Sequence, residues 1–365
     1  NTPNAAAFNL ELIPNNLVES APVEFYIKFI DSKLLFEYNL SIDLGPFMDN
    51  DYARKILLEE LHINEKLIFH RGEQLEIGDL NVIEDYLVNE FSENYNSIIN
   101  VAKSNLIEKE LFLMNGFKNM FSSKIVKIIS QWFEKKFKVV YRADALEIIN
   151  LLDDPNEETI YINKTVNEAA KIFGITSNGI GYIYPDGNTK PKLVSVIKKD
   201  KNKEVVMVLA ELFESYGTVR FVKLFPLIIE ALMNGCTLVI DEFDASIHPM
   251  ALMSIINIFH NNDINKKNAQ LIFDTHNPIF LNSNLFRRDE IKFVERSDES
   301  HFSILYSLSD FGTSNEKGVR KHEDYLKNYF INKYGAIKDI DFTSIFESLV
   351  DIRNGVNNNE KEKNQ

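Results

Sequence analysis

Alternation of apolar and polar positions marks the N-terminal part of the chain. Residues 22–45 alternate on either side of a turn-like segment at 31–33, which predicts an antiparallel hairpin. Residues 56–71 show the same alternation around a turn at 64–65, which predicts two further strands. We therefore expect an antiparallel sheet in this part of the chain.

From about residue 81 the apolar spacing changes to that of a helix. Large apolar residues recur at spacings of four, four, three and four, which places them on one helix face. These residues are Phe117, Phe121, Ile125, Ile128 and Trp132. The lysines of the same stretch are Lys124, Lys127, Lys135, Lys136 and Lys138. A patch for nucleic acid is one interpretation of the lysines, but we favour a solvated helix face opposite the apolar stripe.

Shorter elements follow in the middle of the chain. The pattern predicts helices over 143–152 and 165–173. After a Gly-rich stretch, strands at 192–199 and 204–212 flank a polar turn and predict a second hairpin. The final residues, NNNEKEKNQ, are polar throughout, and we expect them to be disordered.

Composition narrows the class of protein. Of the 365 residues 45% are hydrophobic, which is enough to bury a large core. No apolar run reaches the roughly 18 residues needed to cross a bilayer, so we expect no membrane segment and a cytoplasmic location. The single cysteine, Cys236, is more typical of a small core residue than of a nucleophile. The net charge of -14 does not indicate nucleic acid as a partner, although local basic faces stay open.

Two adjacent carboxylates follow a short buried strand. Leu238 to Ile240 are apolar and rich in β-branched side chains, which is typical of a strand in a parallel sheet. Asp241 and Glu242 come next, at the carboxyl end where ligands collect in α/β folds. Two such charges about 5 Å apart repel by roughly 3 kcal/mol, and a nearby cation removes the conflict. Because Mg²⁺ prefers one or two carboxylates with water and phosphate oxygens, the pair predicts a metal–nucleotide site.

Two further segments are expected near these acids. A second apolar strand, residues 269–276, ends in Thr275-His276 and would bring a histidine to the same sheet edge. Upstream, Ser215 and Gly217 lie at the start of a long helical pattern. A helix N-terminus exposes free N–H groups that suit a phosphate, but an ordinary helix cap explains this segment equally well.

Taken in order, these segments resemble the ABC-type ATPases of the SMC-like and phage-defence group, specifically the AAA-type abortive-infection ATPases. Residues 214–218 look like the signature loop, 237–244 the Walker B strand, 245–249 the D-loop and 273–277 the switch histidine. The resemblance implies an α/β fold of P-loop NTPase, ABC-ATPase type. A mixed sheet, an antiparallel β lobe and a helical insertion are expected with it.

The resemblance also implies roles. Asp241 would hold Mg²⁺ through water, Glu242 would orient or deprotonate the attacking water, and His276 would approach the γ-phosphate of ATP. Residues implied to contact a nucleotide held mainly by a second protomer, across a head-to-tail dimer, are Ser215, Gly217, Thr218, Asp244 and Ser246. Arg220 would pair either with phosphate or with an acidic neighbour, and both alternatives stay open.

Two features depart from the family pattern. Tyr216 stands in the signature where many relatives carry a small residue. No GxxxxGK[ST] occurs in the 365 residues, so the loop that cradles the β-phosphate is not in this sequence. We expect a segment carrying that loop to precede Asn1.

The resemblance divides the chain into four parts. They are a β-rich N-terminal ATPase lobe at 1–80, a helical insertion at 81–185, a C-terminal ATPase lobe with the motifs at 186–310, and a partner-facing segment with a tail at 311–365.

The expected function is an ATP- and Mg²⁺-dependent ATPase. Nucleotide would close a homodimer or higher oligomer, and the chain would act as sensor of an effector, a nuclease or toxin, in antiphage defence. One alternative is an SMC-like ATPase of the DNA-repair type, and another is a non-hydrolysing scaffold. A third is a nuclease or phosphatase that binds two metals through Asp241, Glu242, Asp244, His248 and His276.

Overall fold

The chain divides into two compact units, which we describe separately. The computed structural model describes residues 21–46, 51–88, 91–140, 164–183, 192–198, 205–298, 302–312, 323–337 and 340–350. The units are Asn1–Asn277 and Pro278–Gln365. The four-part division expected from the sequence stays a prediction.

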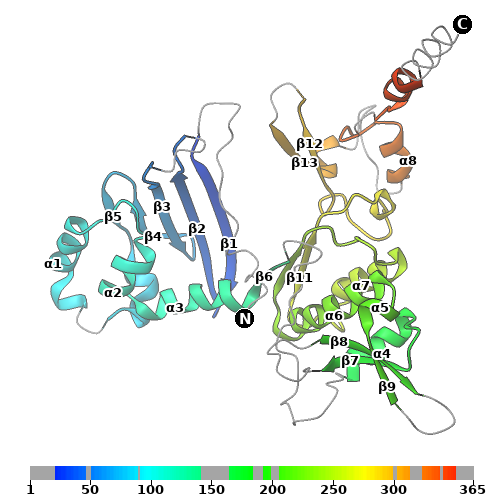
Figure 1. The fold of residues 1–365 in the computed structure, drawn as a ribbon. Coiled ribbons are helices and arrows are strands. Elements are labelled where there is room, and N and C mark those ends of the chain that lie inside the picture. The colour runs from blue at the N-terminus through cyan, green and yellow to red at the C-terminus, as the bar shows by residue number, and fades with distance from the viewer. Residues whose placement is uncertain are drawn as a thin grey trace, which may run out of the picture. The chain divides into compact units, whose positions relative to one another are not determined.

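The first unit opens with an antiparallel sheet in sequence order, β1-β2-β3-β4-β5 (Figure 1). Its strands are β1 (Val23–Asp31), β2 (Leu34–Asp43), β3 (Lys55–Ile63), β4 (Lys66–Arg71) and β5 (Leu75–Ile77). Ser32 and Lys33 have φ of 50° and 64°, and Asn64 and Glu65 have φ of 50° and 65°. Paired left-handed residues fit the twist of two-residue hairpins. Both hairpins predicted from the sequence are confirmed.

Helical segments pack their apolar side chains on this sheet, and we call the assembly the first lobe. The segments are η2 (Leu80–Tyr86), α1 (Phe91–Ser104), η3 (Leu113–Phe117), α2 (Lys118–Met120), α3 (Ser123–Gln131) and η4 (Trp132–Lys136). Phe29 of the sheet stacks on Trp132 with ring centroids 4.0 Å apart. The predicted apolar face is confirmed, because its members are buried except Ile128, which is half-buried.

The stripe does not lie on one continuous helix, and that part of the prediction is wrong. The backbone turns at Ser122, which is extended at φ −154°. Ser122 Oγ accepts a hydrogen bond from the amide of Ile125 at 3.1 Å and so caps α3. The interruption arises because a serine hydroxyl satisfies an amide that a continuing helix would bond to a backbone carbonyl.

A parallel sheet in the order β11-β10-β6 forms another part of the first unit. The strands are β6 (Phe137–Val140), β10 (Thr237–Ile240) and β11 (Gln270–Phe273). The predicted strands at 238–240 and 269–276 are confirmed as parallel neighbours, although the second ends at Phe273. Lys138, expected on a solvated helix face, is wrongly placed by the sequence pattern. The helical stretch ends at Lys136, so Lys138 enters β6, where it is buried and pairs with Glu230.

Helices and a small antiparallel sheet complete the described elements of this unit. They are α4 (Lys164–Phe173), β7 (Gly179–Ile183), β8 (Lys192–Lys198), β9 (Val205–Leu209), α5 (Ala210–Phe213), α6 (Tyr216–Asn234) and α7 (Pro249–His260). The helix predicted at 165–173 is confirmed as α4, and the second hairpin is confirmed as β8 and β9. Residues 210–212 belong to α5 and not to the strand. The helix predicted at 143–152 lies outside the described residues.

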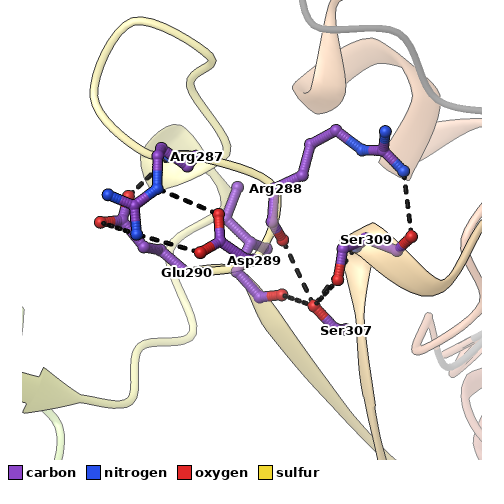
Figure 2. A network of polar contacts seen from close by, with 7 residues as sticks. Arg287, Arg288, Asp289, Glu290, Ser307 and Ser309 are labelled. Carbon is purple, nitrogen blue, oxygen red and sulfur yellow. Dashed lines mark hydrogen bonds and ion pairs between the residues drawn. The ribbon is translucent and has the colours of Figure 1, made fainter. Parts of the chain in front are cut away.

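The second unit has a core of its own, with Phe293, Leu308 and Tyr325 at its centre. Its elements are η5 (Pro278–Phe280), β12 (Lys292–Arg296), β13 (Ser303–Ser307), η6 (Leu308–Phe311) and α8 (Tyr325–Phe330). Figure 2 shows its polar contacts, where Arg288 donates to the carbonyl oxygen of Ser309 at 3.1 Å. In either unit, no helix of the described residues has the length and apolar character to cross a membrane.

Candidate functional site

The carboxyl ends of two neighbouring parallel strands form the candidate site. Ile240, the last residue of β10, pairs with Phe273, the last residue of β11. Asp241 and Glu242 follow the first strand, and Asp274 follows the second. Three carboxyl groups therefore leave the sheet at one edge, where ligands collect in α/β folds. Their chemical roles stay predictions.

Glu242 has a backbone conformation that non-glycine residues rarely adopt. Its φ is 50°, in the left-handed region. Its N–H donates to Oδ1 of Asp274 at 3.1 Å, and its carbonyl oxygen accepts a hydrogen bond from Nη2 of Arg220. The residue as a whole is exposed. The backbone of Glu242 is thus held on both sides while the residue stays open to solvent.

The pKa of the Asp241 carboxyl is raised above its usual range. Burial is the largest cause, followed by the hydrogen bond and the charge of Asp274 and by the charge of Glu242. His276 acts in the opposite direction. A divalent cation would offset the repulsion between these acids, and Mg²⁺ commonly uses one or two carboxylates in this way. A magnesium ion at Asp241 stays a prediction.

His276 lies on the loop after β11, and it is exposed. Its charge acts on Asp241, so the histidine and the acidic pair lie at the same end of the sheet. The loop is shaped by a short polar contact, because the N–H of Asn277 donates to Oγ1 of Thr275 at 3.0 Å. The structure brings His276 to the edge where the acids are, while its contact with a phosphate stays a prediction.

The signature segment begins helix α6. Ser215 is the N-cap residue, and its Oγ accepts a hydrogen bond from the amide of Thr218 at 3.1 Å. The two hydroxyl groups of Ser215 and Thr218 are 2.8 Å apart. The helix-cap alternative is therefore confirmed for Ser215. The cap does not exclude phosphate binding, because Ser215 is exposed and other N–H groups at a helix start have no intrahelical partner.

Gly217 brings the signature segment against the D-loop. A Cβ atom built on Gly217 would lie 2.1 Å from the carbonyl oxygen of Ser246, so no side chain fits without a shift of the backbone. Tyr216 is 59% exposed and leaves this contact free. The effect of Tyr216 on the approach of the signature segment to a nucleotide stays a prediction.

Arg220 is 3% exposed and binds the backbone of the turn after β10. Its Nη1 donates to the carbonyl oxygen of Ala245 at 2.6 Å, and its Nη2 donates to that of Glu242. Burial lowers the pKa of Arg220, and the charges of Tyr216, Glu242, Asp244 and Asp241 oppose this effect. The sequence left open a phosphate or an acidic neighbour as the partner of Arg220. In the structure its hydrogen bonds go to backbone carbonyl oxygens and not to a phosphate or a carboxylate.

The D-loop presents polar side chains from a tethered turn. Phe243 and Ile247 are buried and anchor the turn, while Asp244 is half-buried and Ser246 is exposed. Ser246 has φ of 62°, the second left-handed residue of the turn. Asp244 and Ser246 are therefore accessible for the predicted interface, which stays a prediction.

His248 serves a structural role that the sequence did not indicate. Its Nδ1 accepts a hydrogen bond from the amide of Met250 at 3.2 Å, so the imidazole caps helix α7. The cap uses Nδ1 only and does not by itself exclude a metal at Nε2. Within the stretches that the structure describes, no group of three or more His, Cys, Asp or Glu side chains is arranged to hold a metal. The two-metal nuclease alternative therefore gains no support from His248.

Two acidic residues of the site were missed as functional candidates. Asp274 binds the amide of Glu242, and its place directly after an apolar strand is the signal that could have found it. Glu214 accepts hydrogen bonds from the amides of Thr176 and Ser177 at 2.9 and 3.1 Å. Burial raises the pKa of Glu214, but these bonds outweigh burial and lower it. These hydrogen bonds hold Glu214, the residue directly before the signature serine, in place.

The match to a known family decides the class of protein. Residues 5–282, more than half of the chain, match the model of the family described as AAA domain, putative AbiEii toxin, Type IV TA system. The chain belongs to this family. It is thus related to AAA-type ATPases linked to abortive infection, and the family implies the α/β fold of P-loop NTPases. No match was found among curated proteins.

Proposed function

We propose that the protein is an ATP-binding and ATP-hydrolysing enzyme of the ABC type. Nucleotide closes a dimer of two chains, and the motion regulates an effector, a nuclease or toxin, in antiphage defence. The observation that carries the proposal is the shared edge of β10 and β11, from which Asp241, Glu242 and His276 emerge. Family membership supports the ATPase class and the defence setting.

The site residues have separable tasks in this function. Asp241 would hold Mg²⁺ through water, and the ion would neutralise negative charge on the phosphates. Glu242, exposed next to it, takes a proton from the attacking water or orients that water. His276 donates a hydrogen bond to a phosphate oxygen. Phosphoryl transfer requires mainly positioning and charge stabilisation, which these groups are suited to supply.

The start of α6 contacts the nucleotide of the other protomer. Ser215 presents an exposed hydroxyl at the positive end of a 19-residue helix, and the buried Gly217 lies in the first turn of that helix. Asp244 and Ser246 line the same interface. The 365 residues contain no GxxxxGK[ST], so the proposal names no residues for the β-phosphate cradle.

The second unit supplies the surface for the effector in this proposal. Residues 343–350 are helical, and several large apolar side chains at and beside this helix are more than half exposed. They are Ile340, Phe342, Ile345, Phe346, Leu349 and Val350. Apolar residues that gather on one helix are typical of a surface that a partner protein covers.

Calorimetry with ATP and Mg²⁺ tests the proposal. We expect weak binding by the 365-residue chain and clear binding by a chain extended at its N-terminus, in both cases dependent on Mg²⁺. Ser215→Arg should leave binding to the monomer intact and block nucleotide-dependent dimerisation, measured by light scattering. The control Glu84→Gln changes an exposed acid of the first lobe and should alter neither result.

Two outcomes would overturn the proposal. An extended chain that fails to bind ATP with Mg²⁺ would exclude the ATPase. Hydrolysis of DNA or RNA with Mg²⁺ and without ATP, abolished by Asp241→Asn, would favour the metal-dependent nuclease instead. Binding and hydrolysis with no change in oligomeric state would remove the dimer from the proposal.

A further inference from the structure

The backbone at Glu242 is held in a conformation that costs energy. A non-glycine residue in the left-handed region is strained relative to the right-handed helical conformation, and such residues persist where the surrounding structure determines them. Here the determinants are two polar side chains from different elements. Asp274, after β11, accepts from the N–H of Glu242, and Arg220, from α6, donates to its carbonyl oxygen. Each side chain fixes one of the backbone groups of Glu242.

Arg220 is suited to this position by the shape of its guanidinium group. Its two terminal nitrogens reach two different carbonyl oxygens, those of Glu242 and Ala245. A lysine ammonium is a point donor and does not reproduce a fork of fixed geometry. The remaining Nε of Arg220 is buried and has no hydrogen-bond partner among the described residues. The position of the guanidinium therefore leaves one of its own donors unused while it supplies hydrogen bonds to two carbonyl oxygens of the turn.

Helix α6 and the turn are in contact at a second point. Gly217 lies so close to the carbonyl oxygen of Ser246 that a Cβ would overlap it at 2.1 Å. Gly217 and Arg220 are three residues apart on one helix and so lie on the same face. The N-terminal turn of α6 is therefore joined to the segment from Glu242 to Ser246 by one close contact and two hydrogen bonds.

We propose that Arg220 and Asp274 are positioning residues that lock the backbone of Glu242, and that Arg220 couples this lock to the signature segment. The proposal rests on the proposed function. Because the signature segment contacts the nucleotide of the other protomer and Glu242 acts on the nucleotide of its own, Arg220 links the two nucleotide sites of the dimer. A shift of α6 on contact with the other nucleotide moves the carbonyl group of Glu242 through the guanidinium.

Arg220→Lys tests the lock in the N-terminally extended protein. We expect kcat for ATP hydrolysis to fall about 10- to 100-fold, because small misplacements of a catalytic group cost this much, with KM for ATP changed less than about 3-fold. The matched control is Arg288→Lys in the second unit. Arg288 also donates to backbone carbonyls, that of Ser309 (Figure 2) and that of Gly312, and its Nε likewise has no hydrogen-bond partner among the described residues. The control should leave kcat unchanged.

A double variant separates positioning from a general loss of structure. If Arg220 acts through Glu242, then in a Glu242→Gln background the change Arg220→Lys lowers the remaining turnover by less than about 2-fold. An equal loss in both backgrounds would overturn the proposal. Asp274 offers a conservative pair: Asp274→Asn keeps an oxygen that can accept from the amide of Glu242, and Asp274→Ala does not. We expect higher turnover in Asp274→Asn than in Asp274→Ala, and equal turnover would count against the lock.

Hydrogen exchange gives a readout that does not depend on ATP turnover. Arg220→Lys should speed exchange of the amides at residues 242–247, and Glu242→Gln should not, because the backbone contacts remain. If the unsubstituted protein has no ATPase activity but exchange follows this pattern, the proposed function fails and the lock stands. If exchange in this segment is the same in Arg220→Lys and in the unsubstituted protein, the lock fails whatever the activity.

Discussion

In the first lobe, the carboxylate of Glu59 is fully buried and its contacts are internal. It accepts hydrogen bonds from the amides of Phe112 and Leu113 at 2.6 and 2.9 Å and from the hydroxyl of Tyr38 at 2.9 Å. The guanidinium of Arg71 is 3.5 Å away. Burial raises the pKa of Glu59, and these contacts oppose the rise. A buried charge is tolerated in this arrangement because its partners are inside the protein.

At the end of β10 the same kinds of group are arranged differently. The neighbours that raise the pKa of Asp241 are themselves acids, Asp274 and Glu242. The buried arginine of this region, Arg220, donates to backbone carbonyl oxygens. Among the described residues, it forms no hydrogen bond with these carboxylates. An acid whose partners are internal stabilises the fold, whereas acids that repel one another at an open edge are suited to an external cation.

The largest effect is expected from breaking the internal arrangement. Glu59→Ala removes the acceptor of two backbone amides and leaves the buried charge of Arg71 without its acidic partner. It should lower the free energy of unfolding by about 3–5 kcal/mol. Urea unfolding followed by circular dichroism measures it. The neighbouring Glu60→Ala, on a half-buried residue, should cost less than about 1 kcal/mol. Equal losses would show that Glu59 is no more structural than a surface acid.

Glu242→Gln should have the opposite profile, with a large effect on activity and little on stability. We expect nucleotide binding to persist, turnover to fall by about 100-fold or more because the proton acceptor is lost, and the nucleotide-bound dimer to accumulate. Single-turnover hydrolysis and size-exclusion chromatography measure these effects. Near-normal turnover would remove Glu242 from the mechanism.

The two serine caps sharpen the comparison. Ser122 Oγ caps α3 and also donates to the carbonyl oxygen of Tyr86 at 2.7 Å, in a fully buried position. Ser122→Ala should therefore cost about 1–2 kcal/mol of stability, and Ser215→Ala, at an exposed cap, about 0.5–1 kcal/mol. Only Ser215→Ala should weaken nucleotide-dependent dimerisation. Thermal unfolding measures the stability of both variants, and light scattering measures their nucleotide-dependent dimerisation. A dimerisation defect in Ser122→Ala would contradict a purely structural role for Ser122.

The smallest effect concerns pH. The pKa of Asp241 is raised in the folded protein from 3.8, so Asp241 favours folding at low pH, and this contribution is lost as pH rises through the folded pKa. Asp274→Asn removes the charge of the neighbouring acid and should raise stability at pH 7, by well under about 1 kcal/mol because solvent screens the pair. The gain should shrink as pH falls through the raised pKa of Asp241, because a protonated Asp241 no longer repels a neighbouring negative charge. Thermal unfolding across this range measures it, and a gain that grows toward low pH would contradict the repulsion.

Much of the site follows from local sequence. The strand before Asp241 and the cap at Ser215 depend on apolar runs and on hydroxyl chemistry within a few residues. Other features did not follow. The helix break at Ser122 was missed because a serine is compatible with both a helix and a cap, and the burial of Lys138 was missed because the helix ends two residues earlier.

The sequence by itself determined the hairpins, the two short apolar strands and the acids and histidine that follow them, because periodicity and turn chemistry are local properties of the chain. Only the tertiary structure decided the partners of Glu242. Asp274 and Arg220 lie 32 and 22 residues from it along the chain, and they reach its backbone only because β10 and β11 pair in parallel and α6 packs on the turn. Contacts of this kind depend on how elements pack, and no local pattern specifies that packing.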